Sequence, residues 1–413
     1  MTQSFPQSIV ILLMLGGLTY ADQAVDRTGK THTGRLEQDT DAWSFRAVGA
    51  ALAIKEIAYI RFDAQPVPPP KIPLLHRLQL PHDQHVAGLL QHVDAKSVAF
   101  VTSWGQSVTL PREKLVGIER ANDAATLLHD DFEIDLKAWV VAGNPALSHA
   151  QAVFGKSSLL LDTAGQSAAR TWQPALRDGS VRLFFFLPEK TPDFRWTCEL
   201  LLDSSRDAMP ALIIDRDGCQ CANVKKSWPA LPSSPRWHLL AFELRDERLR
   251  IFVDDYCLAE SPLTDKEGAK GLRCSARTDG KLWIDEFVVS RRLPSLPRPA
   301  LVKNQDLLWL EQGEQLFGRI VSANARSITL DAKFGKRDLP WSRVRGIFFA
   351  QPNAMPALPD QEITFRPGPG FALDRVRAKL LRWENTKLLA RHELLGEIAL
   401  ERACLDKIRF AVE

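Results

Sequence analysis

The sequence predicts an all-β fold, with a central sandwich of two β-sheets and two small β-barrel repeats on each side of it. Three observations predict this class. Apolar residues alternate with polar ones in many short segments, Gly, Pro and Asp gather between the segments, and one pattern recurs four times along the chain. Alternation at a period of two indicates strands, since successive side chains of a strand point to opposite faces.

The central sandwich is predicted from the stretch Trp237–Glu260. Apolar side chains alternate with others from Leu240 to Leu244 and again from Leu249 to Val253. A short polar segment joins the two runs, which is typical of a β-hairpin. We therefore expect a hairpin at the heart of one all-β domain.

This hairpin resembles the middle of laminin-G-like domains, which share the concanavalin-type jelly roll. The second strand here ends in Asp254-Asp255, where those domains usually have Asp-Gly, so the turn differs. Further segments look like the other strands of such domains: 130–133 with Trp139, 155–161, 179–186 and 281–289. The resemblance spans roughly residues 129–292, and it implies a jelly roll that binds a glycan or another protein.

The flanking segments are predicted to be internal repeats. Each copy ends in two apolar residues five positions apart and an isoleucine three positions later. These residues are Leu52, Ile57 and Ile60; Leu110, Leu115 and Ile118; Leu339, Val344 and Ile347; and Leu400, Leu405 and Ile408. Phe62, Phe349 and Phe410 follow the isoleucine by two residues, and the second copy has Arg120 there. Gly34, Gly88 and Gly318 recur upstream in the first three copies.

In strand rhythm the repeats resemble Sm-like and SH3-like small barrels. The nucleotide-stacking and peptide-groove residues of those families are not apparent here, so their binding activities are not implied. The fourth copy diverges most, and its stretch Arg375–Leu389 is compatible with a helix as well as with strands. We expect the barrels to pack beside one another.

Composition shifts set the predicted boundaries. They are 1–21, signal peptide; 22–63, barrel repeat; 64–75, Pro-rich linker; 76–121, barrel repeat; 129–292, jelly roll; 293–305, Pro-rich linker; 306–350, barrel repeat; and 361–413, divergent barrel repeat. Pro-rich linkers are stiff spacers.

The segment Ile9–Leu18 is apolar and is followed by small residues up to Ala21. It has the length of a signal peptide and is too short to span a bilayer. We expect export to the periplasm, the cell envelope or the extracellular space. The alternatives are a buried strand and an uncleaved anchor, because no Lys or Arg precedes the apolar run.

The distribution of charge argues against nucleic-acid binding, and the cysteines leave the disulfide pairing open. The formal net charge is +3 and the charges are interspersed, whereas a nucleic-acid surface would need a basic patch. Five of the six cysteines fall in the central domain, where one or two disulfides would suit an oxidising compartment. The sequence does not fix their connectivity.

The candidate ligand-binding residues are Trp228, Lys225 and Lys226. They lie in a predicted loop, where the Trp could stack against the apolar face of a sugar, and the alternative is a packed Trp. Asp254 and Asp255 are candidate calcium ligands, because calcium prefers oxygen ligands. The alternative is a surface turn rich in Asp. No other cofactor is expected.

The sequence Glu133-Ile134-Asp135 is compared with the alternating carboxylates of laminarinase-type glycosidases, which share the jelly roll. Those enzymes need an acid and a nucleophile on one sheet face, and their motif has a further Glu after the Asp. Lys137 and Ala138 stand there in this chain. We therefore expect no catalytic residue.

These observations favour an exported, non-catalytic binding or scaffolding protein. Two other functions remain open: a structural subunit of an envelope assembly without a small ligand, and an unrecognised glycoside hydrolase. A pair of carboxylates converging in a groove of the jelly roll would favour the hydrolase. A repeated unit favours assembly, since repeats build extended interaction surfaces.

Overall fold

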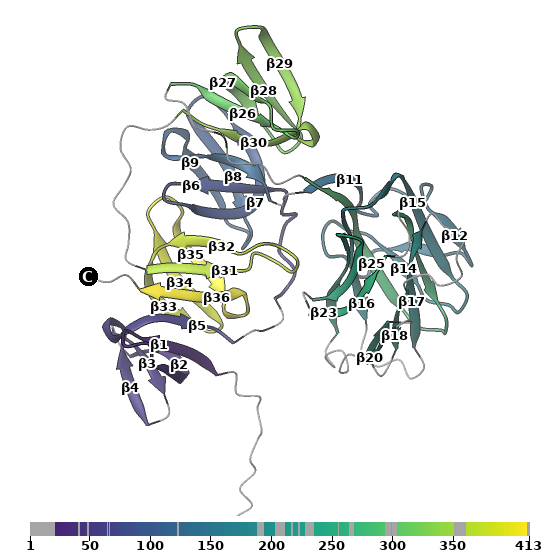
Figure 1. Ribbon diagram of the computed structural model, residues 1–413, viewed down its shortest axis with the longest axis horizontal. Helices are drawn as coiled ribbons and strands as arrows, with labels where there is room; N and C mark the ends of the chain where they lie inside the picture. Colours follow the sequence, from purple (N-terminus) through teal and green to yellow (C-terminus); the bar gives the residue numbers. More distant parts are fainter. Residues whose placement is uncertain are drawn as a thin grey trace, which may run out of the picture.

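The computed structural model consists of a row of four five- or six-stranded units and, beside it, a sandwich of two sheets (Figure 1). It describes residues 21–410 except 40–41, 48, 64, 66, 122–123, 188–193, 203–210, 216–217, 222–223, 228–234, 255, 264–267, 294–298, 300–303 and 351–360. The predicted all-β class with a jelly-roll sandwich is confirmed. Within the described residues, no helix is long and apolar enough to cross a membrane.

The first two units precede the sandwich. Unit 1 comprises β1 (Asp22–Asp26), β2 (Thr31–Asp39), β3 (Ala42–Ala47), β4 (Ala50–Ala53), the 3-10 turn η1 (Ile54–Glu56) and β5 (Ile57–Arg61). Unit 2 comprises β6 (His76–Leu80), β7 (Gln84–Val93), β8 (Ser97–Thr102), β9 (Ser107–Pro111), η2 (Arg112–Lys114) and β10 (Gly117–Arg120).

The other two units follow the sandwich. Unit 3 comprises β26 (Asp306–Leu310), β27 (Gln315–Ala323), β28 (Ser327–Ala332), β29 (Gly335–Pro340), η3 (Trp341–Arg343) and β30 (Val344–Phe348). Unit 4 comprises β31 (Gln361–Phe365), β32 (Asp374–Arg377), β33 (Lys379–Glu384), β34 (Lys387–His392), β35 (Gly396–Glu401), η4 (Arg402–Cys404) and β36 (Leu405–Phe410). The stretch Arg375–Leu389, which was compatible with a helix, therefore belongs to strands β32, β33 and β34 and the turns between them. The resemblance of the units to Sm-like or SH3-like barrels stays a prediction.

The repeated glycines are explained by close backbone approach. An added Cβ would lie 2.1 Å from a carbonyl oxygen of the next strand at Gly34 and at Gly88, and 2.4 Å from one at Gly318. Unit 4 has Ala378 at this position, and its strand is interrupted there between β32 and β33. This interruption is where unit 4 diverges from the others.

The units pair through their last strands, and the repeated isoleucines lie opposite one another. Strand β10 of unit 2 pairs with β30 of unit 3, with Ile118 opposite Ile347. Strand β36 of unit 4 pairs with β5 of unit 1, with Ile408 opposite Ile60. Each pair therefore joins one unit from before the sandwich to one from after it.

An ion pair with a buried aspartate occurs at the equivalent place in both pairs of units. The Arg112 guanidinium donates to the Asp306 carboxylate at 2.5 Å, and the Arg402 guanidinium donates to Asp22 at 2.6 and 2.7 Å. Each arginine begins its unit's 3-10 turn, and each aspartate begins the first strand of the partner unit. The arginines also lie over Phe349 and Phe62, respectively.

The two pairs meet between unit 2 and unit 4, again with matching contacts. The Asp374 carboxylate accepts a hydrogen bond from the Ala87 N–H at 2.6 Å, and the Gln84 amide oxygen accepts one from the Arg377 N–H at 2.5 Å. Arg375 lies opposite His85 in the strand pairing. Three strands of unit 4, β33, β34 and β35, form a separate sheet, and the other 18 strands of the four units form one sheet in the spatial order 3-2-4-1. We call it the array.

The sandwich consists of two antiparallel sheets. The eight-stranded sheet contains β11 (Ala124–Asp130), β13 (Ala146–Ser148), β14 (Ser158–Leu161), β16 (Gly179–Leu187), β21 (Arg236–Arg245), β22 (Arg248–Val253), β23 (Tyr256–Pro262) and β25 (Leu282–Arg292). The seven-stranded sheet contains β12 (Val140–Ala142), β15 (Ser167–Leu176), β17 (Arg195–Leu202), β18 (Ala211–Asp215), β19 (Gly218–Cys221), β20 (Val224–Ser227) and β24 (Ala269–Ala276). The predicted hairpin is β21 and β22, paired from Leu240 opposite Val253 to Arg245 opposite Arg248.

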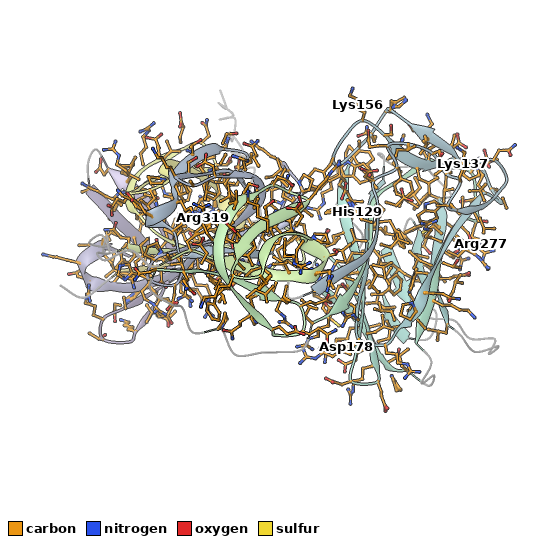
Figure 2. The ribbon with its side chains drawn as sticks, turned by 90° about the horizontal axis from the view of Figure 1, so that it is seen from above. His129, Lys137, Lys156, Asp178, Arg277 and Arg319 are labelled. Carbon is orange, nitrogen blue, oxygen red and sulfur yellow. The ribbon has the colours of Figure 1, made fainter. Side chains whose placement is uncertain are left out.

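One sheet of the sandwich faces the array. The Arg182 guanidinium on β16 donates to the Gly370 carbonyl at 2.9 Å, from the loop between β31 and β32, and Arg291 on β25 pairs with Glu311 of unit 3. We call the eight-stranded sheet the array-side sheet and the seven-stranded one the far sheet. Figure 2 shows His129 on the side of the sandwich toward the array and Arg277 on the side turned away from it.

Candidate functional site

The outer face of the far sheet carries a groove of about 400 Å³. Strands β12, β15, β17 and β24 supply its lining, and Gly165 closes one end. The core-facing residues of these strands, such as Trp196 and Leu272, are fully buried between the sheets. Because side chains alternate along a strand, the residues between them must face outward into the groove.

Charged side chains gather on one side of the groove. Glu199 on β17 lies 3.5 Å from the Arg273 guanidinium and 3.4 Å from the Arg277 guanidinium. The side chain of Glu199 is 19% exposed, whereas those of Arg273 and Arg277 are 48% and 54% exposed. The carboxylate is therefore held in place by two arginines that still present donors to solvent.

Small side chains form the rest of the floor. Ser167 lies opposite Ser275 in the pairing of β15 with β24, and Ala169 lies opposite Arg273. Val140, which is 73% exposed, lies opposite Ala169 at the edge of the sheet. The groove therefore combines hydroxyl groups, arginine donors and one carboxylate acceptor with an exposed apolar edge.

This arrangement suits a ligand that both donates and accepts hydrogen bonds. Arginine offers only donors, an ionised carboxylate offers only acceptors, and a serine hydroxyl offers both. Among the described residues that line the groove, Glu199 is the only carboxylate. Glycoside hydrolysis by the usual acid and base or nucleophile needs two carboxyl groups flanking the bond.

Two of the three predicted ligand-binding residues lie on the strand at the opposite edge of the same sheet. Lys225 and Lys226 lie on β20, the edge strand that pairs with β19. Their side chains are outside the description, and Trp228 lies outside the described residues altogether. The role assigned to these three residues therefore stays a prediction.

The contacts of Asp254 argue against the predicted calcium role. Its carboxylate accepts hydrogen bonds from the Arg236 guanidinium at 2.9 Å, from the His238 ring at 2.7 Å and from the Leu239 N–H at 3.0 Å. A guanidinium beside the carboxylate competes with a cation, so the geometry gives Asp254 a structural role in the turn after β22. Asp255 lies outside the described residues, within which no group of three or more potential ligands could hold a metal ion.

The Glu133-Ile134-Asp135 segment follows β11 as an irregular loop, and its carboxylates already have partners. Glu133 accepts hydrogen bonds from the Lys156 and Ser157 N–H groups at 2.6 and 2.8 Å. Asp135 pairs with Lys137 at 2.8 Å on the surface. The two carboxylates therefore serve loop structure.

The disulfides expected in the central domain are not formed by Cys198, Cys257 or Cys274, which are free thiols. The Cys198 and Cys274 sulfurs lie 3.7 Å apart on paired strands. Burial raises the pKa of the Cys198 thiol.

The groove was not predicted from the sequence. Glu199 and Arg277 are 78 positions apart, so no local spacing connects them. Their alternation with buried neighbours was the one available signal, and it identifies an outward face without identifying a site.

The chain matches no protein-family model, and a search of curated proteins found no match. Solved structures match over about two fifths of the chain. One is a xylan-binding domain, at 15% identity and a TM-score of 0.27, covering 42% of this chain and 100% of that one. Another is the laminarinase catalytic domain from Thermotoga maritima, at 10% identity and a TM-score of 0.32, covering 42% and 100%. A third is a galectin-like protein of unknown function from Bacillus subtilis, at 14% and 0.29, covering 41% and 97%. Similarity at this level carries no argument about function.

Proposed function

We propose that the chain is an exported, non-catalytic binding protein whose sandwich takes a glycan in the groove of the far sheet. The observation that carries this proposal is the set of groups around Glu199: one carboxylate between two partly exposed arginines, beside serine hydroxyls. A sugar hydroxyl can donate to the carboxylate and accept from a guanidinium at the same time. Exposed Val140 offers an apolar contact for the ring C–H groups.

The single carboxylate supports a binding role over a hydrolytic one. In this proposal Glu199 and Arg273 fix the orientation of the ligand, and among the described lining residues no second carboxyl group is available for hydrolysis. Lys225 and Lys226, on the edge strand β20 of the same sheet, would extend the contact to a longer chain of sugars, together with Trp228 of the sequence-based prediction.

The experiment is a glycan array probed with the purified chain from residue 22 onward, with and without calcium. A saturable hit should weaken at least about ten-fold with Arg273→Ala, because a hydrogen bond to a charged group contributes about 1.5–3 kcal/mol. The matched control is Arg319→Ala, since Arg319 of unit 3 also pairs with a carboxylate, Asp331, at 3.4 Å on the surface. Figure 2 shows Arg319 in the array, well away from Arg277.

The outcomes separate the candidate functions. Binding that Arg319→Ala preserves and Arg273→Ala removes supports the groove. Binding that requires calcium would support the prediction that Asp254 and Asp255 are calcium ligands. No hit from a folded chain would contradict glycan binding, and it would favour a structural subunit of an envelope assembly. The 18-stranded array supports that second candidate, since a long continuous sheet offers an extended surface.

A further inference from the structure

A second cavity lies between the sandwich and the array, on the opposite side of the sandwich from the groove. Its volume is about 180 Å³. One wall comes from β11, β16 and β25 of the array-side sheet. The other comes from the linker around Pro70–Leu75 and from the loop that carries Pro369 and Phe371. Ligand sites occur preferentially at such junctions between domains.

Most of this junction pocket is apolar. Pro70, Pro73 and Leu74 of the linker line it together with Phe371 of the loop. Phe184 and Val288 contribute apolar side chains from the sheet wall. A dry cavity of about 150 Å³ in another protein accommodates a benzene ring. The junction pocket is therefore large enough for a ring-sized apolar group.

A row of three hydroxyl side chains crosses the sheet wall of the pocket. Thr126 lies opposite Ser290, which lies opposite Ser180 on its other side. Ser180 and Ser290 are each only 8% exposed, and both line the pocket. Within the described part of the chain, neither serine hydroxyl has a hydrogen-bond partner, and neither is among the fully buried unpaired groups. The two hydroxyls are therefore open to the pocket and available to a ligand.

The charged residues of the pocket wall are mostly cationic. Arg120 and Arg182 line it together with His129, whose ring lies 2.8 Å from the Glu286 carboxylate. The hydrogen bond from His129 to Glu286 raises the pKa of the histidine, so the imidazole carries more positive charge near neutrality than a free one would. Among the described lining residues, Glu286 is the only carboxylate. Glu243 lies 3.9 Å from Arg182, outside the lining.

We propose that the junction pocket binds a small organic carboxylate with a ring-sized apolar body. The apolar body would pack between Leu74 and Phe371, and the carboxylate would accept hydrogen bonds from Ser180 and Ser290 in the positive potential of the two arginines. This site is separate from the groove of the far sheet, and the proposal does not depend on glycan binding.

The test is isothermal titration of the full chain from residue 22 onward with benzoate, with benzyl alcohol as the neutral ligand of similar size. We expect one benzoate per chain, and an affinity for benzyl alcohol at least about ten-fold lower, because a hydrogen bond to a charged acceptor is the stronger one. No saturable heat up to about 10 mM benzoate would overturn the proposal. Equal affinity for the alcohol would overturn the carboxylate class.

Variants locate the site. Ser180→Ala combined with Ser290→Ala should weaken benzoate binding at least about ten-fold, since both donors are lost. The matched control is Ser107→Ala combined with Thr109→Ala, which removes two exposed hydroxyls from β9 of unit 2. Benzoate binding that survives the first pair of substitutions, in a chain with unchanged far-UV circular dichroism, would place the ligand elsewhere. Arg273→Ala should leave benzoate binding unchanged, so the two sites are tested independently.

Discussion

At the scale of single residues, the contact between unit 2 and unit 4 places two different side chains in equivalent surroundings. Gln84 and Asp374 occupy matching positions, and each accepts a hydrogen bond from a backbone N–H of the other unit. Asp374 is fully buried, and desolvation raises its pKa to about 7 against the opposing effects of Arg77 and the Ala87 N–H. The amide at position 84 makes the same contact without a charge.

This difference predicts that Asp374 makes stability depend on pH. The carboxyl group ionises near pH 7 in the folded chain and near pH 3.8 in the unfolded chain, so folding takes up a proton between these values. Stability should therefore fall as pH rises from about 4 to about 7, by at most about 1.4 kcal/mol per unit, and then level off. Asp374→Asn should flatten this dependence in urea unfolding between pH 5 and pH 8.

The control for this prediction is Asp331→Asn, which neutralises an exposed carboxylate of unit 3. It should leave the pH dependence as in the parent chain. The idea fails if Asp374→Asn and the parent chain lose stability in parallel as pH rises.

Side-chain contacts between the units could not be predicted from the sequence. The repeated isoleucines and phenylalanines could be aligned by their spacing. The arginines and aspartates that join the units could not, because Arg112 and Asp306 are 194 positions apart and Asp22 and Arg402 are 380 apart. A partner at that separation is set by the assembled fold and leaves no local pattern.

At the scale of strands, the repeat is maintained by close backbone approach at one glycine. A Cβ at Gly88 would lie 2.1 Å from the Val101 carbonyl oxygen and 2.5 Å from the ring of Phe100. Both neighbours belong to β8, which pairs with β7 along its length. Unit 4, with Ala378, tolerates a side chain there only with a break in the strand.

We therefore predict that Gly88→Ala destabilises the chain by about 1–3 kcal/mol or more, as overpacking does in a tight interior. Gly29→Ala is the matched control, because Gly29 has a positive φ of 90° but no atom within 4 Å of an added Cβ. The control should cost only the backbone strain, about 1–2 kcal/mol. Urea unfolding compares the two, and an equal loss for both would contradict the close-approach explanation.

The strands themselves were largely predictable. Alternation identified the β21–β22 hairpin, and the spacing of the isoleucines identified the last strand of every unit. The segment 130–133 was predicted to be a strand, but β11 ends at Asp130. The Glu133 carboxylate instead accepts hydrogen bonds from backbone N–H groups of a neighbouring loop.

At the scale of the whole molecule, each pair joins a unit that precedes the sandwich in the sequence to a unit that follows it. Neither the two N-terminal units nor the two C-terminal units therefore form a complete pair on their own. Units 1 and 2 each have a last strand whose partner lies in the C-terminal half. The sequence indicated four similar units but not this crossed pairing, because all four last strands share one pattern and any two could have paired on that evidence.

The crossed pairing predicts that two fragments reassemble. Residues 22–121 and 304–410, produced separately without the sandwich, should combine into a 1:1 complex measured by light scattering after size-exclusion chromatography. Arg112→Ala should weaken the complex by about 3 kcal/mol, since it leaves the Asp306 carboxylate buried without its guanidinium. Arg46→Ala removes an exposed arginine of unit 1 and should have no such effect. Fragments that stay apart would contradict the pairing.

The meeting of β1, β5 and β36 also has a mechanical consequence. Asp22 begins β1 and Phe410 ends β36, and only β5 separates these two strands. A pulling force applied at these residues would be carried through one short path of hydrogen bonds and through the Arg402–Asp22 ion pair. Units 2 and 3 and the whole sandwich lie outside that path, so tension between Asp22 and Phe410 leaves the far-sheet groove unloaded until units 1 and 4 separate.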